Sequence, residues 1–145
     1  MAVTRKRKPK IVASAVPLTS ADLARLAARV ADDKKAEDVV IMDLTGFPYV
    51  TDYFVIASSS NPRQMAAISH AIQHEMALHG RRAVGVQGAD DAHWVLVDCS
   101  DFVVHIFDPD WRKLYDLELL WGDVPRLAWA EPKRKRGASS EKTSE

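Results

Sequence analysis

Carboxylates are the side chains of this sequence that could carry chemistry. Asp98 and Asp101 flank a predicted two-residue turn, Cys99-Ser100, between two apolar stretches. Two carboxylates placed in this way can hold a divalent cation or act as general acid and base, although carboxylates are also ordinary turn residues. One hypothesis for this chain is therefore a metal- and nucleotide-dependent enzyme, similar to a nucleotidyltransferase, that uses Asp43, Asp98 or Asp101.

That enzyme hypothesis lacks its sequence motif. Nucleotidyltransferases need a Gly-Ser turn that leads into an Asp-x-Asp pair, and the one Asp-x-Asp pair in the sequence is Asp108-Pro109-Asp110. This pair follows the last predicted strand and contains a proline, so we expect it to form a turn. The enzyme hypothesis therefore stays an alternative.

Other patterns for catalysis or metal binding are incomplete. His70 and His74 have the i, i+4 spacing of a metal pair, but they lie opposite the apolar stripe of a predicted helix and have no evident third ligand. Cys99 is the single cysteine, which excludes an internal disulfide and the usual zinc sites. Ser58–Ser60 lie outside any G-x-S-x-G motif, and no phosphate-binding glycine loop occurs. We therefore predict no catalytic residue, no cofactor and no metal site.

The apolar stretches on either side of the turn predict a β-hairpin of residues 93–98 and 102–107. Pairing about Cys99-Ser100 would place Trp94 opposite His105 and Asp98 opposite Asp101. Because side chains alternate along a strand, each face of the hairpin has its own composition. One face would be apolar core, made of Val95, Val97, Phe102, Val104 and Ile106. The other would be too apolar for solvent and too polar for core, with Trp94, Leu96, Asp98, Asp101, Val103, His105 and Phe107.

The elements that must position this hairpin follow from caps and periodicity. Thr19 and Asp22 resemble a capping box before an amphipathic helix that begins at residue 19 or 20. Asn61-Pro62 predicts an N-cap and first residue of a second helix that ends near Gly80. Further strands are predicted at 39–44, 53–57 and 83–87, and a short helix at 116–121. The order αββαβββα predicts an α+β fold, with a mixed five-stranded sheet and helices mainly on one face.

Charge divides the chain into three parts. The sequence has 145 residues, which fits one domain, and a formal net charge of zero. Residues 1–18 and 131–145 together hold ten basic and three acidic residues, whereas residues 19–130 hold ten basic and seventeen acidic ones. We predict a flexible basic arm, an acidic domain and a disordered charged tail. The basic ends could contact nucleic acid phosphates. With no apolar run long enough to span a membrane and no secretory pattern, we expect a cytoplasmic protein.

The sequence resembles the ribosomal silencing factor family, also called the Iojap-related family. The resemblance covers roughly residues 20–127 and rests on six motifs in order: Asp38–Leu44, Thr51–Ile56, Arg63-Gln64, Trp94–Asp98, Val103–Phe107 and Tyr115–Trp121. It implies a nucleotidyltransferase-like fold without that activity. It also implies binding to a large-subunit ribosomal protein, number fourteen in the universal naming, which blocks joining of the two subunits and represses translation under nutrient limitation. Several family members are homodimers.

For this chain, the resemblance and the mixed hairpin face together predict a partner-binding site. Aromatic side chains anchor interfaces, and acidic ones suit a basic ribosomal protein. Packing under the last helix is the alternative role for the aromatic residues. The family's usual Asp-Tyr-Gly-Asp turn is replaced here by Asp98-Cys-Ser-Asp101, which argues against a type I′ turn because a positive φ is costly for serine. The predicted site residues are Trp94, Asp98, Asp101, His105, Phe107 and Tyr115.

Overall fold

The computed structural model describes residues 18–47, 50–88 and 93–130. The predicted arm, apart from Leu18, and the predicted tail lie outside the described residues. In chain order the elements are α1 (Ser20–Asp33), β2 (Glu37–Asp43), β3 (Tyr53–Ser58), α2 (Pro62–Leu78), β4 (Gly85–Gln87), β5 (Trp94–Asp98), β6 (Phe102–Phe107), α3 (Pro109–Tyr115) and α4 (Leu117–Trp121). In the described part of the chain, no helix has the length and apolar character needed to cross a bilayer.

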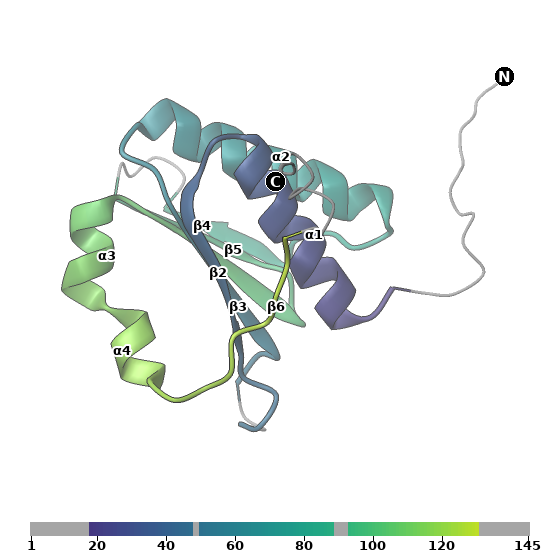
Figure 1. The fold of residues 1–145 in the computed structure, drawn as a ribbon. Coiled ribbons are helices and arrows are strands. Elements are labelled where there is room, and N and C mark those ends of the chain that lie inside the picture. The colour runs from purple at the N-terminus through teal and green to yellow at the C-terminus, as the bar shows by residue number, and fades with distance from the viewer. Residues whose placement is uncertain (1–17, 48–49, 89–92, 131–145) are drawn as a thin grey trace, which may run out of the picture.

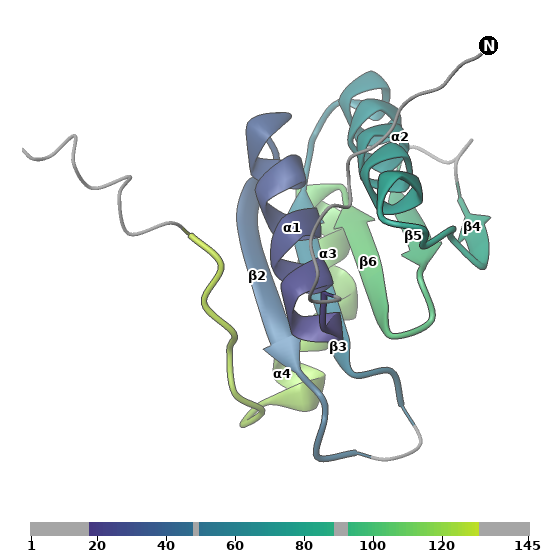
Figure 2. The same cartoon turned by 90° about the vertical axis from the view of Figure 1, so that its right-hand side faces the viewer.

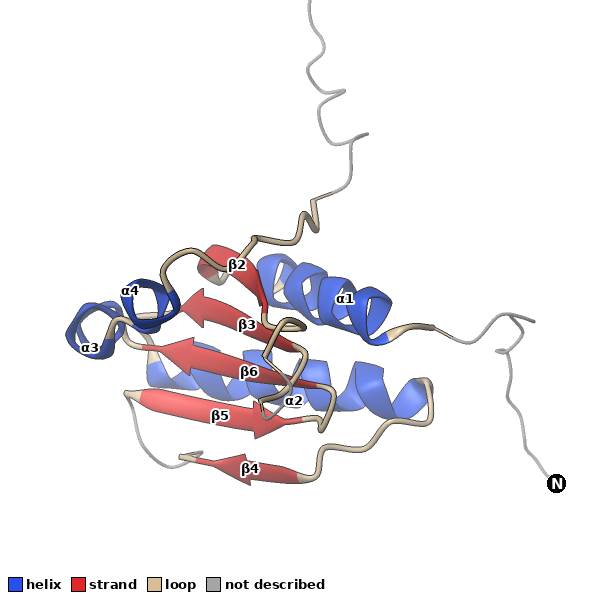
Figure 3. Ribbon diagram, turned by 90° about the horizontal axis from the view of Figure 1, so that it is seen from below, coloured by secondary structure: helices blue, strands red, loops and turns tan. Residues whose placement is uncertain are grey.

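The strands form one mixed sheet in the order β2-β3-β6-β5-β4 (Figure 3). β3 and β6 are parallel, and the other neighbouring pairs are antiparallel. This arrangement confirms the predicted α+β fold with a five-stranded mixed sheet. Helices α1 and α2 cover one face, and α3 and α4 lie on the other side of the sheet (Figures 1 and 2).

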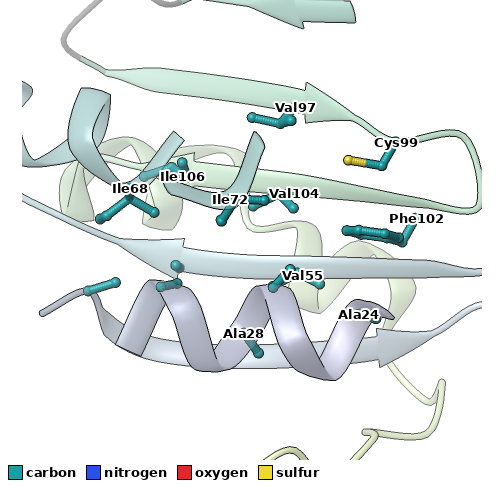
Figure 4. Packing of buried hydrophobic residues seen from close by; sticks show 14 of the residues in the cluster. Ala24, Ala28, Val55, Ile68, Ile72, Val97, Cys99, Phe102, Val104 and Ile106 are labelled. Carbon is teal, nitrogen blue, oxygen red and sulfur yellow. The ribbon is translucent and has the colours of Figure 1, made fainter. Parts of the chain in front are cut away.

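The main core lies between the sheet and the helices α1 and α2. Strand residues such as Val55, Val104 and Ile106 meet Ile68 and Ile72 of α2 in this layer (Figure 4). Helix α1 presents small side chains to the sheet, which allows its backbone to approach closely. These are Ala24, Ala27, Ala28 and Ala31, all fully buried.

The helix caps are as predicted. The Thr19 side chain accepts a hydrogen bond from the Asp22 amide, and the Asp22 carboxylate accepts one from the Thr19 amide. The bond from the Thr19 amide to the carboxylate is the main reason why the pKa of Asp22 lies below its usual value. In α2, Asn61 Oδ1 accepts hydrogen bonds from the first turn, and Pro62 occupies the first helical position. Gly80, with φ of 73°, follows the end of α2.

The hairpin register differs from the prediction by two residues. Trp94 lies opposite Phe107 rather than His105, and Asp98 lies opposite Val103 rather than Asp101. Ser100-Asp101, not Cys99-Ser100, forms the tip, because the Cys99 amide donates to the carbonyl of Phe102. Cys99 is buried and continues the core-facing row, which leaves the polar residues for the turn. A shift of two residues keeps every side chain on its predicted face.

The serine in the turn does adopt a positive φ. Ser100 has φ of 73°, and its amide donates to the carboxylate of Asp98 at 2.8 Å. The Asp101 amide donates to the carbonyl of Cys99. Within this turn only Ser100 has a positive φ, whereas a type I′ turn requires two such residues. The turn is therefore not type I′.

The prediction of a turn at Asp108-Pro109-Asp110 is wrong. Asp108 caps α3 by accepting from the Asp110 amide, and Pro109 occupies the first turn of that helix. Asp116, with φ of 43°, ends α3 and its carboxylate caps α4. The predicted helix at 116–121 is thus α4, and the element order is αββαβββαα.

A segment after α4 runs beside β2. The Asp43 amide donates to the carbonyl of Pro125, the Leu127 amide donates to the carbonyl of Ile41, and Trp129 Nε1 donates to the carbonyl of Val39. We call residues 125–129 the C-terminal segment. It gives the edge of β2 backbone partners along much of its length.

Candidate partner-binding surface

Aromatic rings from β5, β6 and α3 gather on the sheet face opposite α1 and α2. The Trp94 ring lies 4.8 Å from that of Phe107 and 4.9 Å from that of Tyr115, measured between ring centroids. Trp94 Nε1 also donates to His105 Nδ1 at 3.1 Å. The structure therefore brings together four of the six predicted site residues, which we call the aromatic cluster: Trp94, His105, Phe107 and Tyr115.

The four members of the aromatic cluster differ in accessibility. Phe107 and His105 are buried, with 1% and 4% of their surface exposed. Trp94 is half-buried, and Tyr115 is 46% exposed. A partner could therefore touch Trp94 and Tyr115 directly, while Phe107 and His105 support them from below.

His105 is held neutral by its surroundings. Burial lowers the pKa of His105 to about 4. The neutral ring has one acceptor nitrogen, and the indole N–H of Trp94 occupies it at Nδ1. The proton therefore resides on Nε2, which is buried and finds no hydrogen-bond partner among the described residues.

The two predicted carboxylates lie away from the aromatic cluster. Asp98 is four residues along β5 from Trp94, a separation of roughly 13 Å at the usual strand rise. Its carboxylate is engaged by the Ser100 amide. Asp101 forms an ion pair with Arg81 at 3.0 Å, and both side chains are more than 40% exposed. These carboxylates shape the hairpin tip and can contact a partner only at its periphery.

The enzyme hypothesis uses Asp43, Asp98 or Asp101 to hold a metal ion and a nucleotide. Asp43 lies on β2, and its carboxylate accepts from both the amide and the hydroxyl of Thr45. Strands β3 and β6 separate β2 from β5. Among the described residues, no three His, Cys, Asp or Glu side chains form a group that could hold a metal ion. The Asp43 carboxylate thus serves the loop after β2, whereas the carboxylates of Asp98 and Asp101 both lie at the hairpin tip.

Helices α3 and α4 are joined by a partly buried ion pair between Arg112 and Glu118, which the sequence did not predict. Arg112 Nε and Nη2 donate to the two carboxylate oxygens of Glu118 at 2.9 and 3.0 Å. Arg112 Nη1 also donates to Ser58 Oγ at the end of β3. The hydrogen bond from Arg112 lowers the pKa of Glu118. This arrangement fixes both helices, and therefore Tyr115, against the sheet.

The exposed apolar side chains near this joint form what we call the elbow surface: Phe47, Leu114, Tyr115, Leu119 and Leu120. Leu114, Leu119 and Leu120 are each more than 70% exposed. Phe47 contacts Trp121 of α4 with ring centroids 5.2 Å apart. A hollow of about 660 Å³ lies beside them, between the loop at residues 43–47 and residues 120–125. Clustered exposed apolar side chains are typical of an interaction surface.

Comparisons with a family model and with known proteins indicate the same family for this chain. The family model described as "Ribosomal silencing factor during starvation" matches residues 17–145. The ribosomal silencing factor RsfS of Bacillus subtilis is 43% identical over 101 residues, which cover 70% of this chain and 86% of that protein. The same factor of Halalkalibacterium halodurans is 38% identical over 110 residues, which cover 76% and 94% of the two chains.

Solved structures agree with this result. A crystal structure from Bacillus halodurans is 37% identical, with a TM-score of 0.64, and the match covers 73% of this chain and 96% of that one. A crystal structure from Chromobacterium violaceum is 29% identical, with a TM-score of 0.70, and covers 79% and 94%. The family model's match over residues 17–145 includes the strands β5 and β6 and the helix α3, which carry the aromatic cluster. The chain therefore belongs to the ribosomal silencing factor family.

Proposed function

We propose that this protein binds the large ribosomal subunit and prevents it from joining the small subunit, and that it represses translation in this way when nutrients are limiting. The contact would be made with ribosomal protein number fourteen of the large subunit in the universal naming. The protein would act in the cytoplasm by occupying space, without catalysing a reaction. Membership of the family supports this proposal.

The observation that carries the proposal is the position of Trp94. Its ring rests on Phe107, touches Tyr115 and remains partly exposed. Large rings held in this way, partly buried and surrounded by other apolar groups, are the usual anchors of protein interfaces. The elbow surface lies next to it through Tyr115 and supplies further apolar contact area.

Charge supports a basic partner. Residues 19–130 carry a net excess of seven acidic residues. Complementary charge raises the rate of encounter and excludes wrong partners. Asp98 and Asp101 at the hairpin tip would act at the rim of the contact, and the basic arm and tail would add contacts to ribosomal RNA phosphates.

Sedimentation of purified subunits tests the proposal. Large and small subunits are mixed at a magnesium concentration that normally pairs them, with and without the protein. We expect free subunits to persist in its presence, with the protein found in the large-subunit fraction alone. Complete pairing at saturating protein would contradict the proposal.

Two controls make the result specific. Sedimentation of the protein alone shows whether the free protein is a homodimer, as we propose. Calorimetry with magnesium and nucleoside triphosphates tests the enzyme alternative. Saturable heats of nucleotide binding, without any effect on the subunits, would favour that alternative.

A further inference from the structure

His105 is the buried polar side chain that touches the proposed anchor. The strand register places Leu96 opposite His105 and Trp94 opposite Phe107, so the bond from Trp94 Nε1 to His105 Nδ1 crosses the strand pair diagonally. The acceptor comes from the central strand β6 and the donor from β5. The bond therefore ties a partly exposed ring to the interior of the sheet.

Packing fixes the imidazole independently of this bond. The ring is parallel to that of Phe107, with an angle of 9° between planes and centroids 5.9 Å apart. Phe54 approaches it edge-on, with centroids 4.5 Å apart. With 4% of its surface exposed, His105 has little freedom to change rotamer. Its Nδ1 is thus an acceptor at a fixed position.

The other ring nitrogen of His105, Nε2, makes the buried position of the imidazole unfavourable in free energy. Nε2 carries a proton and has no hydrogen-bond partner among the described residues. A buried donor without a partner costs free energy, and an apolar side chain of similar size would avoid that cost. The imidazole therefore differs from an apolar side chain at this position by supplying a hydrogen-bond acceptor, Nδ1.

We propose that His105 is a positioning residue for the ribosome contact: its Nδ1 holds the Trp94 indole in the orientation that the partner binds. This inference rests on the proposed function, in which Trp94 is the anchor. A ring already held in its bound orientation loses less conformational freedom on binding, which raises affinity. His105 itself does not touch the partner.

Two substitutions at position 105 distinguish the effect of the hydrogen bond from the effect of packing. His105→Asn places an amide oxygen near the position of Nδ1 and keeps an acceptor, whereas His105→Leu keeps apolar bulk and removes it. Ile56→Val is the matched control, because Ile56 is fully buried and packs in the same cluster as Phe107 and Trp94 but takes no part in the bond. All three proteins are compared with the wild type by thermal melting before binding is measured.

The first measurement is exchange of the Trp94 indole hydrogen with solvent, followed by NMR and assigned with Trp94→Phe. We expect slow exchange in the wild type and His105→Asn, and fast exchange in His105→Leu. Fast exchange in the wild-type protein would overturn the proposal even if a variant failed to fold.

The second measurement is affinity for isolated large subunits. We expect His105→Leu to weaken binding about tenfold, the effect of one hydrogen bond, and His105→Asn and Ile56→Val to bind nearly as the wild type does. In the Trp94→Phe background, His105→Leu should cause no further loss. Equal losses in both backgrounds, or no loss in the first, would overturn the inference. Failure of the wild type to bind would instead overturn the proposed function.

Discussion

Gly88 lies so close to the backbone of Trp94 that a Cβ atom at position 88 would be 2.1 Å from the Trp94 carbonyl oxygen. Gly88 also has φ of 78°, which side chains other than glycine rarely adopt. Glycine at position 88 therefore allows the backbone at the end of β4 to lie against the start of β5, where Trp94 lies.

Gly88→Ala should destabilise the protein by at least about 2 kcal/mol, because clash and strained backbone act together. Gly85→Ala is the matched control: Gly85 lies on the same strand, β4, and a Cβ there would meet nothing within 4 Å. Its effect should stay within about 0.5 kcal/mol. Urea denaturation of both variants measures the difference, and equal stabilities would contradict the close approach.

Trp94→Ala should reduce affinity for the large subunit by at least about 2 kcal/mol, as expected of an aromatic anchor. Because the ring is partly exposed, the loss of folding stability should be smaller than the roughly 3–5 kcal/mol of a fully buried aromatic residue. Trp129→Ala is the control, since Trp129 packs with the core beneath the opposite face of the sheet. A folded Trp94→Ala protein that binds at full strength would exclude this site.

Leu119→Lys should weaken large-subunit binding and leave the melting temperature nearly unchanged, because Leu119 is 74% exposed on the elbow surface. Leu78→Lys makes the same change at the end of α2, where the leucine is 62% exposed but distant from the aromatic cluster. Co-sedimentation of both variants with large subunits gives the comparison. If both bind as the wild type does, the elbow surface is not part of the contact.

The free energy of unfolding should depend on His105 between pH 6.5 and 4. Because burial lowers the pKa of His105 from 6.5 to about 4 in the folded protein, the unfolded chain binds a proton in this range that the folded protein does not. Stability therefore falls as the pH decreases, by about 3 kcal/mol over the full range. Urea denaturation at several pH values should show a steeper fall for the wild type than for His105→Asn. Parallel curves would show that the imidazole titrates normally.

Removal of residues 1–17 and 131–145 should leave the melting temperature nearly unchanged. If these basic ends contact RNA phosphates, their removal should also reduce the salt dependence of ribosome binding, because fewer counterions are released. Binding of the shortened and full-length proteins is measured over a series of salt concentrations. Identical slopes would remove the basic ends from the contact.

Patterns within a few neighbouring residues predicted the start of a helix and the two faces of the hairpin. The N-cap and proline at Asn61-Pro62 gave the start of α2, and strand alternation gave both faces of the hairpin. Alternation could not give the register, because a shift of two residues leaves every side chain on the same face. Burial of Cys99 decides between the two pairings, and it depends on the packed core.

The site was predictable only in part. Trp94 and His105 share a face in either register, so their proximity followed from the sequence. Asp108-Pro109 has the same cap-and-proline pattern as Asn61-Pro62, and it could have revealed α3. The contact of Arg112 with Ser58 joins residues 54 positions apart. Periodicity along the sequence does not indicate contacts between residues so far apart. The placement of α3 and α4 against the sheet therefore had to come from the structure.

The C-terminal segment has a consequence for solubility. An uncovered strand offers a row of free amides and carbonyls to which another chain can add. Here Pro125, Leu127 and Trp129 occupy those groups on β2, and Arg25 and Arg29 of α1 hold the segment by its carbonyl oxygens at Ala128 and Trp129. A chain that ended before residue 125 would lose the packing of Leu127 and Trp129 against the main core and leave this edge open, so we expect its molecules to aggregate through that edge.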